Sequence, residues 1–147
     1  SIGSRFIGSK FKVRAVRGSV YLAIRSARMG TGLKSFEELD VYKLCCQLRR
    51  EARAETRNWP KEEQYRLTDQ IIRSTRSAPT QIDEGWGRFS RMDNRRFCRI
   101  AMGSLCETQD HLTTALEEDC SSQARHDELR ALCLQCQDKL KGNEVPG

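Results

Sequence analysis

The sequence predicts an all-α protein, an up-and-down antiparallel four-helix bundle that follows a basic N-terminal extension. Apolar residues recur at spacings of three and four in four segments between residues 35 and 142. Short stretches containing Gly, Pro, Asn or Ser separate these segments, as is typical of antiparallel helices joined by short loops. A chain of 147 residues fits one domain that buries its own core.

The chain divides into three parts by composition. Residues 1–34 hold eight Lys or Arg and no acid, so 26 − 8 = 18 basic residues face 20 acidic residues in the remainder. We expect 1–34 to be a basic extension, a tag or a mis-assigned start, with Met29 as an alternative beginning. Disorder is the preferred interpretation there, although its alternating pattern also allows a β-hairpin. We expect the bundle over 35–142 and a tail over 143–147.

The first helix is expected to begin at Ser35 and to end near Arg57. Ser35 followed by Glu38 has the spacing of a capping box. Its predicted buried stripe is Val41, Cys45, Leu48 and Ala52, and its predicted water-facing residues are Lys43, Arg50, Arg53 and Arg57.

The second helix is expected from about Pro60 to Glu84, because Pro suits a first helical turn. Its apolar face holds Leu67, Ile71, Ala78 and Ile82. Pro79 lies within this helix, where it removes a backbone donor and predicts a kink. Thr80 and Ser77 are candidates to cap the carbonyls that Pro79 frees.

Gly85-Trp86-Gly87 predicts a break before a third helix that begins near Ser90 or Arg91. Its predicted stripe is Phe97, Ala101, Ser104, Thr108, Leu112 and Ala115. After a polar connection over 119–123, the fourth helix is marked by Leu129, Leu132, Cys133, Cys136 and Leu140. Gly142 and Pro146 are expected to end it.

Four stretches carry a resemblance to a known family: "LTDQIIRSTRSAPTQIDEGWGR", "RFCRIAMGSLCE", "FEELDVYKLCCQL" and "WPKEEQYRLTDQI". They resemble the four-helix-bundle proteins encoded in intervening sequences of bacterial 23S ribosomal RNA genes, over Phe36 to about Lys141. The resemblance implies a homopentameric ring, and it assigns no biochemical activity. A fainter similarity, to accessory proteins of diversity-generating retroelements, rests only on the shared bundle pattern.

The pattern of Cys and His residues favours neither a metal site nor an enzyme. The seven cysteines are odd in number and lie on predicted helices, so we expect reduced thiols that serve mostly as core residues. Cys133 and Cys136 form a C-x-x-C, but the second pair of a zinc site is absent. We expect His111 and His126 at the surface or at its boundary. No nucleophile motif occurs, so we expect no enzymatic activity, no metal and no cofactor.

Arginines around the turn at Trp86 are the candidate site. We call these six the arginine strip: Arg73, Arg76, Arg88, Arg91, Arg95 and Arg99. If the second and third helices are antiparallel about Trp86, Arg76 and Arg99 lie at similar heights. Arg suits bidentate phosphate binding. The alternative is a solvated face, or ion pairs between subunits that use Asp69, Asp83, Glu84 and Asp93.

Two aromatic residues beside the strip leave a second choice open. Trp86 and Phe89 are candidates to stack on unpaired RNA bases. In a tight turn, however, such side chains more often pack over the end of a bundle, and we favour packing.

The sequence and the resemblance together predict a non-enzymatic, ring-forming protein that binds nucleic acid, with RNA preferred over DNA, through the arginine strip. The alternative is an adaptor that docks on another protein, such as a reverse transcriptase or a ribosome-associated factor. The longest apolar run, 20–24, is far too short to span a bilayer, so we expect a cytoplasmic protein without membrane contact.

Overall fold

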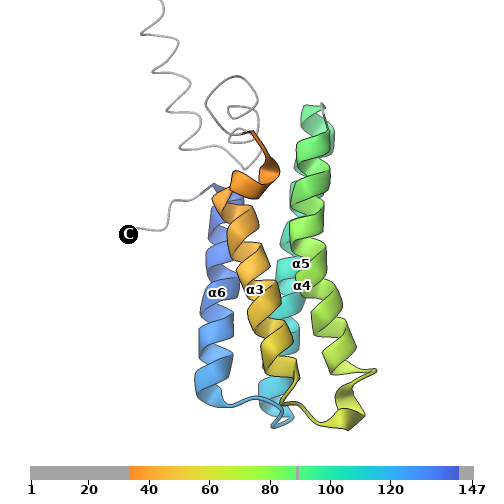
Figure 1. The fold of residues 1–147 in the computed structure, drawn as a ribbon, viewed down its shortest axis with the longest axis vertical. Helices are drawn as coiled ribbons and strands as arrows, with labels where there is room; N and C mark the ends of the chain where they lie inside the picture. The colour runs from red at the N-terminus through yellow and green to blue at the C-terminus, as the bar shows by residue number, and fades with distance from the viewer. Residues whose placement is uncertain (1–33, 89, 143–147) are drawn as a thin grey trace, which may run out of the picture.

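A computed structural model describes residues 34–88 and 90–142, and within this part the backbone of Arg91 but not its side chain. Its four α-helices are α3 (Asp40–Thr56), α4 (Leu67–Gly87), α5 (Arg91–Glu117) and α6 (Gln123–Lys141). Each helix packs on the next in sequence, and α6 packs back against α3 (Figure 1). The described residues contain no strand. The predicted four-helix bundle is confirmed, whereas the expectations for residues 1–33, Phe89 and 143–147 lie outside the described residues.

The core lies along the common axis of the four helices. All four predicted apolar stripes contribute to it, because inward-facing residues recur at helical spacing. Its fully enclosed members include Leu48 of α3, Ile71 and Ile82 of α4, Leu105 and Leu112 of α5, and Leu129 of α6.

The start of α3 differs from the prediction. Ser35 and Glu38 do act as caps, since the Ser35 hydroxyl accepts from the Glu37 N–H at 3.2 Å and the Glu38 carboxylate accepts from the Lys34 N–H at 3.1 Å. They cap a 3₁₀ turn, η1 (Phe36–Glu38), rather than the long helix. Leu39 then takes extended backbone angles, and α3 begins only at Asp40.

The bounds of α4 also differ from the predicted Pro60–Glu84. Pro60 precedes a short 3₁₀ turn, η2 (Lys61–Glu63), and Arg66 has a non-helical backbone. The Glu63 carboxylate accepts from the Leu67 N–H at 3.3 Å, which supports the true beginning of α4 at Leu67. At the other end, 85–87 extend the helix by its last turn instead of breaking it.

Pro79 lies inside α4 and is buried. Pro79 leaves the Thr75 carbonyl without its helical donor, but Thr80 donates to the Arg76 carbonyl at 3.0 Å, so the prediction that Thr80 caps the freed carbonyl is wrong. Ser77 does not cap a carbonyl of α4 in this way. Its hydroxyl instead accepts from Ser104 of α5 at 2.8 Å, so the prediction for Ser77 is wrong.

The remaining helix ends follow the sequence signals. Ser90 caps α5, where its hydroxyl accepts from the Asp93 N–H, and Ser122 caps α6 in the same way through Arg125. Gly142 follows α6 in the left-handed conformation, at φ 80°. This conformation suits Gly because it has no side chain.

Candidate nucleic-acid interface

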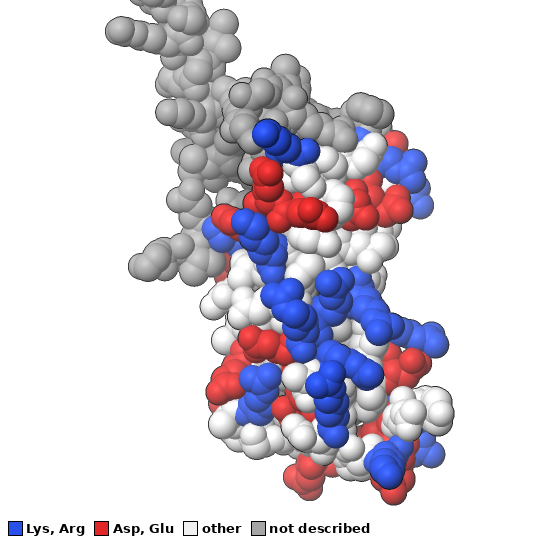
Figure 2. All heavy atoms as spheres, viewed as in Figure 1, with Lys and Arg blue, Asp and Glu red and all other residues white. Residues whose placement is uncertain are grey.

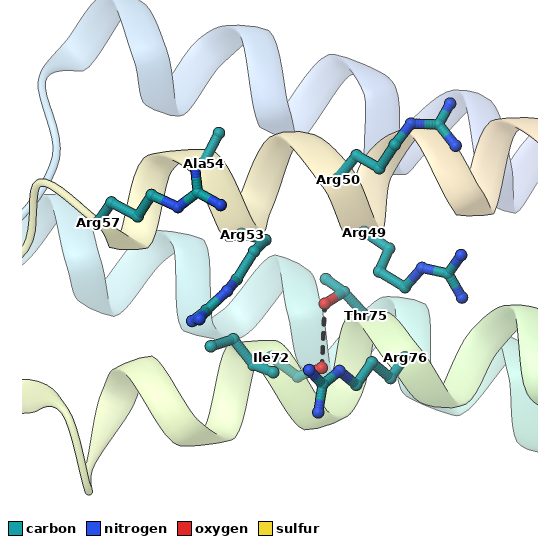
Figure 3. Close-up of a pocket in the computed structure, with 8 residues that line it drawn as sticks. All are labelled: Arg49, Arg50, Arg53, Ala54, Arg57, Ile72, Thr75 and Arg76. Atoms are coloured by element: carbon teal, nitrogen blue, oxygen red, sulfur yellow. Dashed lines mark hydrogen bonds between the residues drawn. The ribbon is translucent and has the colours of Figure 1, made fainter.

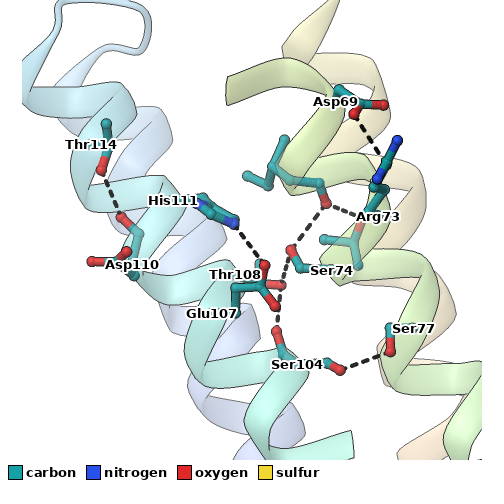
Figure 4. Close-up of polar contacts among 12 residues, drawn as sticks. Asp69, Arg73, Ser74, Ser77, Ser104, Glu107, Thr108, Asp110, His111 and Thr114 are labelled. Carbon is teal, nitrogen blue, oxygen red and sulfur yellow. Dashed lines mark hydrogen bonds and ion pairs between the residues drawn. The ribbon is translucent and has the colours of Figure 1, made fainter. Parts of the chain in front are cut away.

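Pairs of hydroxyl groups show how α4 and α5 lie against each other. Ser104 lies 2.8 Å from Ser77, and Thr108 lies 2.8 Å from Ser74, measured between hydroxyl oxygens (Figure 4). This antiparallel register places Arg76 level with Leu105, not with Arg99. The two arginines are therefore offset by about six residues, or roughly 9 Å along the helix axes. The prediction of equal heights about Trp86 is wrong.

The same pairs show which side of α5 faces α4. Ser104 is on that side, and at 3.6 residues per turn Arg99 lies about 140° and Arg95 about 180° round the helix from it. Gln109, which bonds to Gln137 of α6 at 3.0 Å, marks the α6 side. Arg95 lies about 40° from Gln109 on the helix circumference. Arg95 and Arg99 consequently face away from α4.

Arg73 and Arg76 of the strip lie on α4 and Arg88 follows its last residue, and these three also diverge. Arg73 pairs with Asp69 at 3.0 Å on the outer face. Arg88 pairs with Glu84 at 3.5 Å, and its guanidinium lies 5.1 Å from the Phe97 ring centre. Arg76 is exposed on the side that faces α3. The described members of the arginine strip therefore do not share one surface.

Trp86 is half-buried and packs against the apolar core. This contact agrees with the packing interpretation that the sequence favoured over base stacking. Phe89 is not among the described residues.

A different set of arginines does come together, in a hollow of about 360 Å³ between α3 and α4 (Figure 3). Its lining contains five arginines, which we call the arginine groove: Arg49, Arg50 and Arg53 of α3, Arg57 directly after α3, and Arg76 of α4. Ala54, Ile72 and Thr75 complete the lining, and no acidic residue belongs to it. Figure 2 shows Lys and Arg side chains gathered over α3 and α4 in the lower half of this face.

Within 34–88 and 90–142, no ion pair or hydrogen bond involves the guanidinium group of any groove arginine, although the backbone carbonyls of Arg53 and Arg76 accept from Thr56 and Thr80. The ion pairs of this part of the chain use Arg73, Arg88, His111 and Arg125 instead. Arg49, Arg53 and Arg57 follow one another at four-residue spacing, where like charges repel. Five cations thus share one concave surface without an acidic partner among the described residues.

The acids of α3 are engaged elsewhere, by a residue of α6. Arg125 lies 3.2 Å from Glu55 and 3.7 Å from Glu51, and it also pairs with Glu128 at 2.8 Å. A hydrogen bond to Glu128 is the main reason that the pKa of Arg125 rises above its ordinary value. Glu51 and Glu55 therefore face α6, which leaves the arginines on the α4 side of α3 without them.

Sequence reasoning missed the groove. It predicted only that Arg50, Arg53 and Arg57 face water, and it did not single out Arg49. The spacing of these arginines could have indicated the groove. Four arginines fall within nine residues at spacings of three and four, so they cover one broad face of α3.

A family model described as 23S rRNA-intervening sequence protein matches residues 37–142. The match spans the whole bundle from η1 to Gly142. The chain belongs to this family. The predicted resemblance is thereby confirmed, and the family's association with ribosomal RNA genes fits a small helical protein that acts near nucleic acid. The fainter similarity to retroelement accessory proteins stays a prediction. A search of curated proteins found no match.

The histidines differ from the prediction that placed them at the surface or at its boundary. His111 and His126 are both buried, and His126 Nδ1 lies 3.0 Å from the Leu112 carbonyl oxygen. His111 Nε2 lies 3.2 Å from Glu107 (Figure 4). Each imidazole fits between helices because its ring carbons pack while one nitrogen keeps a polar partner.

Cys45, Cys46, Cys133 and Cys136 are buried, in agreement with their predicted packing role, whereas Cys106 is exposed. All seven cysteines are unbridged. In the part of the chain that the structure describes, no group of three or more His, Cys, Asp or Glu residues is placed to hold a metal ion. None of the described helices is both long enough and apolar enough to cross a membrane.

Proposed function

We propose that this protein is a non-enzymatic RNA-binding protein whose contact surface is the arginine groove. The observation that carries the proposal is the gathering of five arginines in one hollow, without an acidic partner among the described residues. Each guanidinium presents a planar fork of donors that matches a phosphate. A polyanion would relieve the mutual repulsion of these five charges while it bonds to them.

RNA is the polyanion that the family context favours, since the family model is named for sequences within 23S ribosomal RNA genes. The binding surface proposed differs from the arginine strip. Arg76 belongs to both sets, but Arg95 and Arg99 face away from α4, and Arg73 and Arg88 already have acidic neighbours.

The test compares three variants of the full chain in titrations of a labelled RNA at several salt concentrations. The groove variant changes Arg49, Arg53 and Arg57 to Gln. The strip variant changes Arg91, Arg95 and Arg99 to Gln. The matched control changes Arg66, Arg96 and Arg130 to Gln, three arginines outside both sets that lose the same total charge. Every protein keeps residues 1–34, so any RNA affinity that their eight basic residues add is the same in all of the titrations.

We expect the groove variant to lose affinity at least tenfold beyond the control, with a flatter dependence of affinity on salt. If the strip variant loses affinity and the groove variant matches the control, the groove is the wrong surface. If no variant differs from the parent, RNA binding by the bundle is wrong, and docking on a protein partner becomes the better hypothesis.

We further propose that the bundle assembles into a homo-oligomeric ring, as the sequence resemblance implies. A ring would repeat the arginine groove on every subunit and so bind one RNA at several points, which raises avidity without new contacts. Light scattering at micromolar concentration tests this, and a monomer mass would exclude the ring.

A further inference from the structure

We infer that the arginine groove binds consecutive backbone phosphates of a single RNA strand, and that it leaves the bases outside without reading them. The inference rests on the proposed function and specifies its chemistry. Three features of the groove carry it: its charge, the spacing of its arginines and the residues missing from its lining.

The charge of the groove calls for several anions together. Five guanidinium groups line one hollow of about 360 Å³, and none of them has an ion-pair partner within 34–88 or 90–142. A base is neutral and would neutralise none of these charges. A strand of RNA supplies one negative charge per nucleotide through its backbone, so a short stretch of strand neutralises the groove.

The spacing of the arginines matches a strand that runs along α3. Arg49, Arg53 and Arg57 are separated by four residues each, which corresponds to a rise of about 6 Å between neighbours. Neighbouring phosphates of an extended nucleic-acid strand have a similar separation. Arg76 lies on the opposite wall, and Figure 3 shows Arg53 extending from α3 toward α4. One phosphate can therefore receive donors from both helices.

Apart from the arginines, which can also read guanine, the lining lacks groups that recognise a base. It holds no aromatic ring for stacking and no Asn or Gln for paired hydrogen bonds to a base edge. Its one hydroxyl, that of Thr75, is buried and donates to the Ile71 carbonyl at 2.7 Å. The remaining lining residues, Ala54 and Ile72, are apolar. A hollow between two adjacent helices also admits a single backbone more readily than a whole duplex.

The experiment measures affinity for oligonucleotides of equal length that differ only in their bases. Oligo-U, oligo-A, oligo-C and an abasic phosphodiester strand are titrated against the full chain, and a duplex of the same length is included. We expect the four single strands to bind within about threefold of one another, and the duplex to bind more weakly.

Single substitutions test the phosphate register. Arg49→Gln, Arg53→Gln and Arg57→Gln should each reduce the log–log salt slope by about 0.7, the value for one lost phosphate contact on a single strand. Arg130→Gln, at an exposed position outside the groove, serves as the control and should leave the salt slope unchanged.

The outcomes separate this inference from the proposed function. A preference above tenfold for one base, loss of binding to the abasic strand or tighter binding of the duplex would overturn backbone recognition while RNA binding through the groove stands. Unchanged affinity for every oligonucleotide in all three groove variants would overturn both.

Discussion

The two neighbours of α4 meet it in opposite ways. Toward α5 the contact is closed, because Ser74 and Ser77 of α4 meet Thr108 and Ser104 at 2.8 Å and the hydroxyls bond to one another. Toward α3 the helices leave the arginine groove, because guanidinium groups have only donors and repel one another. The difference teaches that one helix can hold the bundle together on one side and present charge on another.

Residue size and polarity both contribute to this difference. Positions 74 and 76 are two residues apart and therefore about 160° apart on the circumference of α4. Small side chains that satisfy one another allow close approach of two backbones, whereas long cationic side chains must keep their charged ends in water. Substitutions on the two sides should consequently have opposite effects on stability.

The largest expected effect comes from filling the closed side. Ser104→Leu should lower the free energy of unfolding by about 2–4 kcal/mol, since it adds volume between α4 and α5 and removes a hydrogen bond. Urea unfolding followed by circular dichroism measures this. Arg53→Leu, the matched change in the groove, should be neutral or slightly stabilising. Equal losses in both variants would show that the two sides do not differ.

A second prediction concerns the α5–α6 contact, which is closed like that between α4 and α5. Burial raises the pKa of the Cys133 thiol to about 12, and the thiol lies 3.2 Å from the Leu105 carbonyl oxygen. Because the folded pKa exceeds the unfolded value near 9, this thiol contributes stability below about pH 9 that is lost as pH rises toward 12. The loss should approach about 1.4 kcal/mol per pH unit.

Cys133→Ser removes this titration, so its unfolding free energy should fall less steeply between pH 9 and 11 than that of the parent. Cys106→Ser, at an exposed position, should keep the parent slope. Chemical denaturation at each pH provides the measurement, and identical slopes for the two variants would contradict the assignment to Cys133.

A smaller effect is expected from the hydroxyl pair itself. The Thr108 hydroxyl lies 2.8 Å from Ser74 and 2.9 Å from the Ser104 carbonyl oxygen. Thr108→Val keeps the shape but removes both bonds, so it should cost about 1 kcal/mol of unfolding free energy. Thr113→Val, at an exposed position of the same helix, should cost far less. Similar losses at both positions would show that the contact with α4 adds nothing.

The smallest effect has the opposite sign. Arg53→Gln removes a charge that repels two others, those of Arg49 and Arg57, at four-residue spacing. The free energy of unfolding should therefore rise by about 0.4–1 kcal/mol at low salt. The gain should fade as salt screens the charges. Arg73→Gln should instead lose a few tenths of a kcal/mol, because Arg73 pairs with Asp69. Thermal unfolding at two salt concentrations checks both, and a gain for Arg53→Gln that persists at high salt would point to a cause other than charge.

Local signals predicted the helices better than their beginnings. Ser90 and Gly142 were recognised because a cap acts on its own helix within one turn. Ser35 and Pro60 misled, because the same residues also begin 3₁₀ turns, and only the backbone of Leu39 and Arg66 shows where α3 and α4 begin. The burial of His111 and His126 was missed because it depends on packing against other helices.

The sequence by itself determined which residues of each helix face inward, because a period of 3.6 residues places them without reference to any partner. It also determined the family, whose model matches 37–142. Only the tertiary structure decided which arginines share a surface. The register of α4 against α5, seen at the hydroxyl pairs, separates Arg76 from Arg99. Arg125, about 70 residues along the chain, engages Glu51 and Glu55. The interaction between two charges depends on the distance between them in space, and that distance depends on how the helices pack.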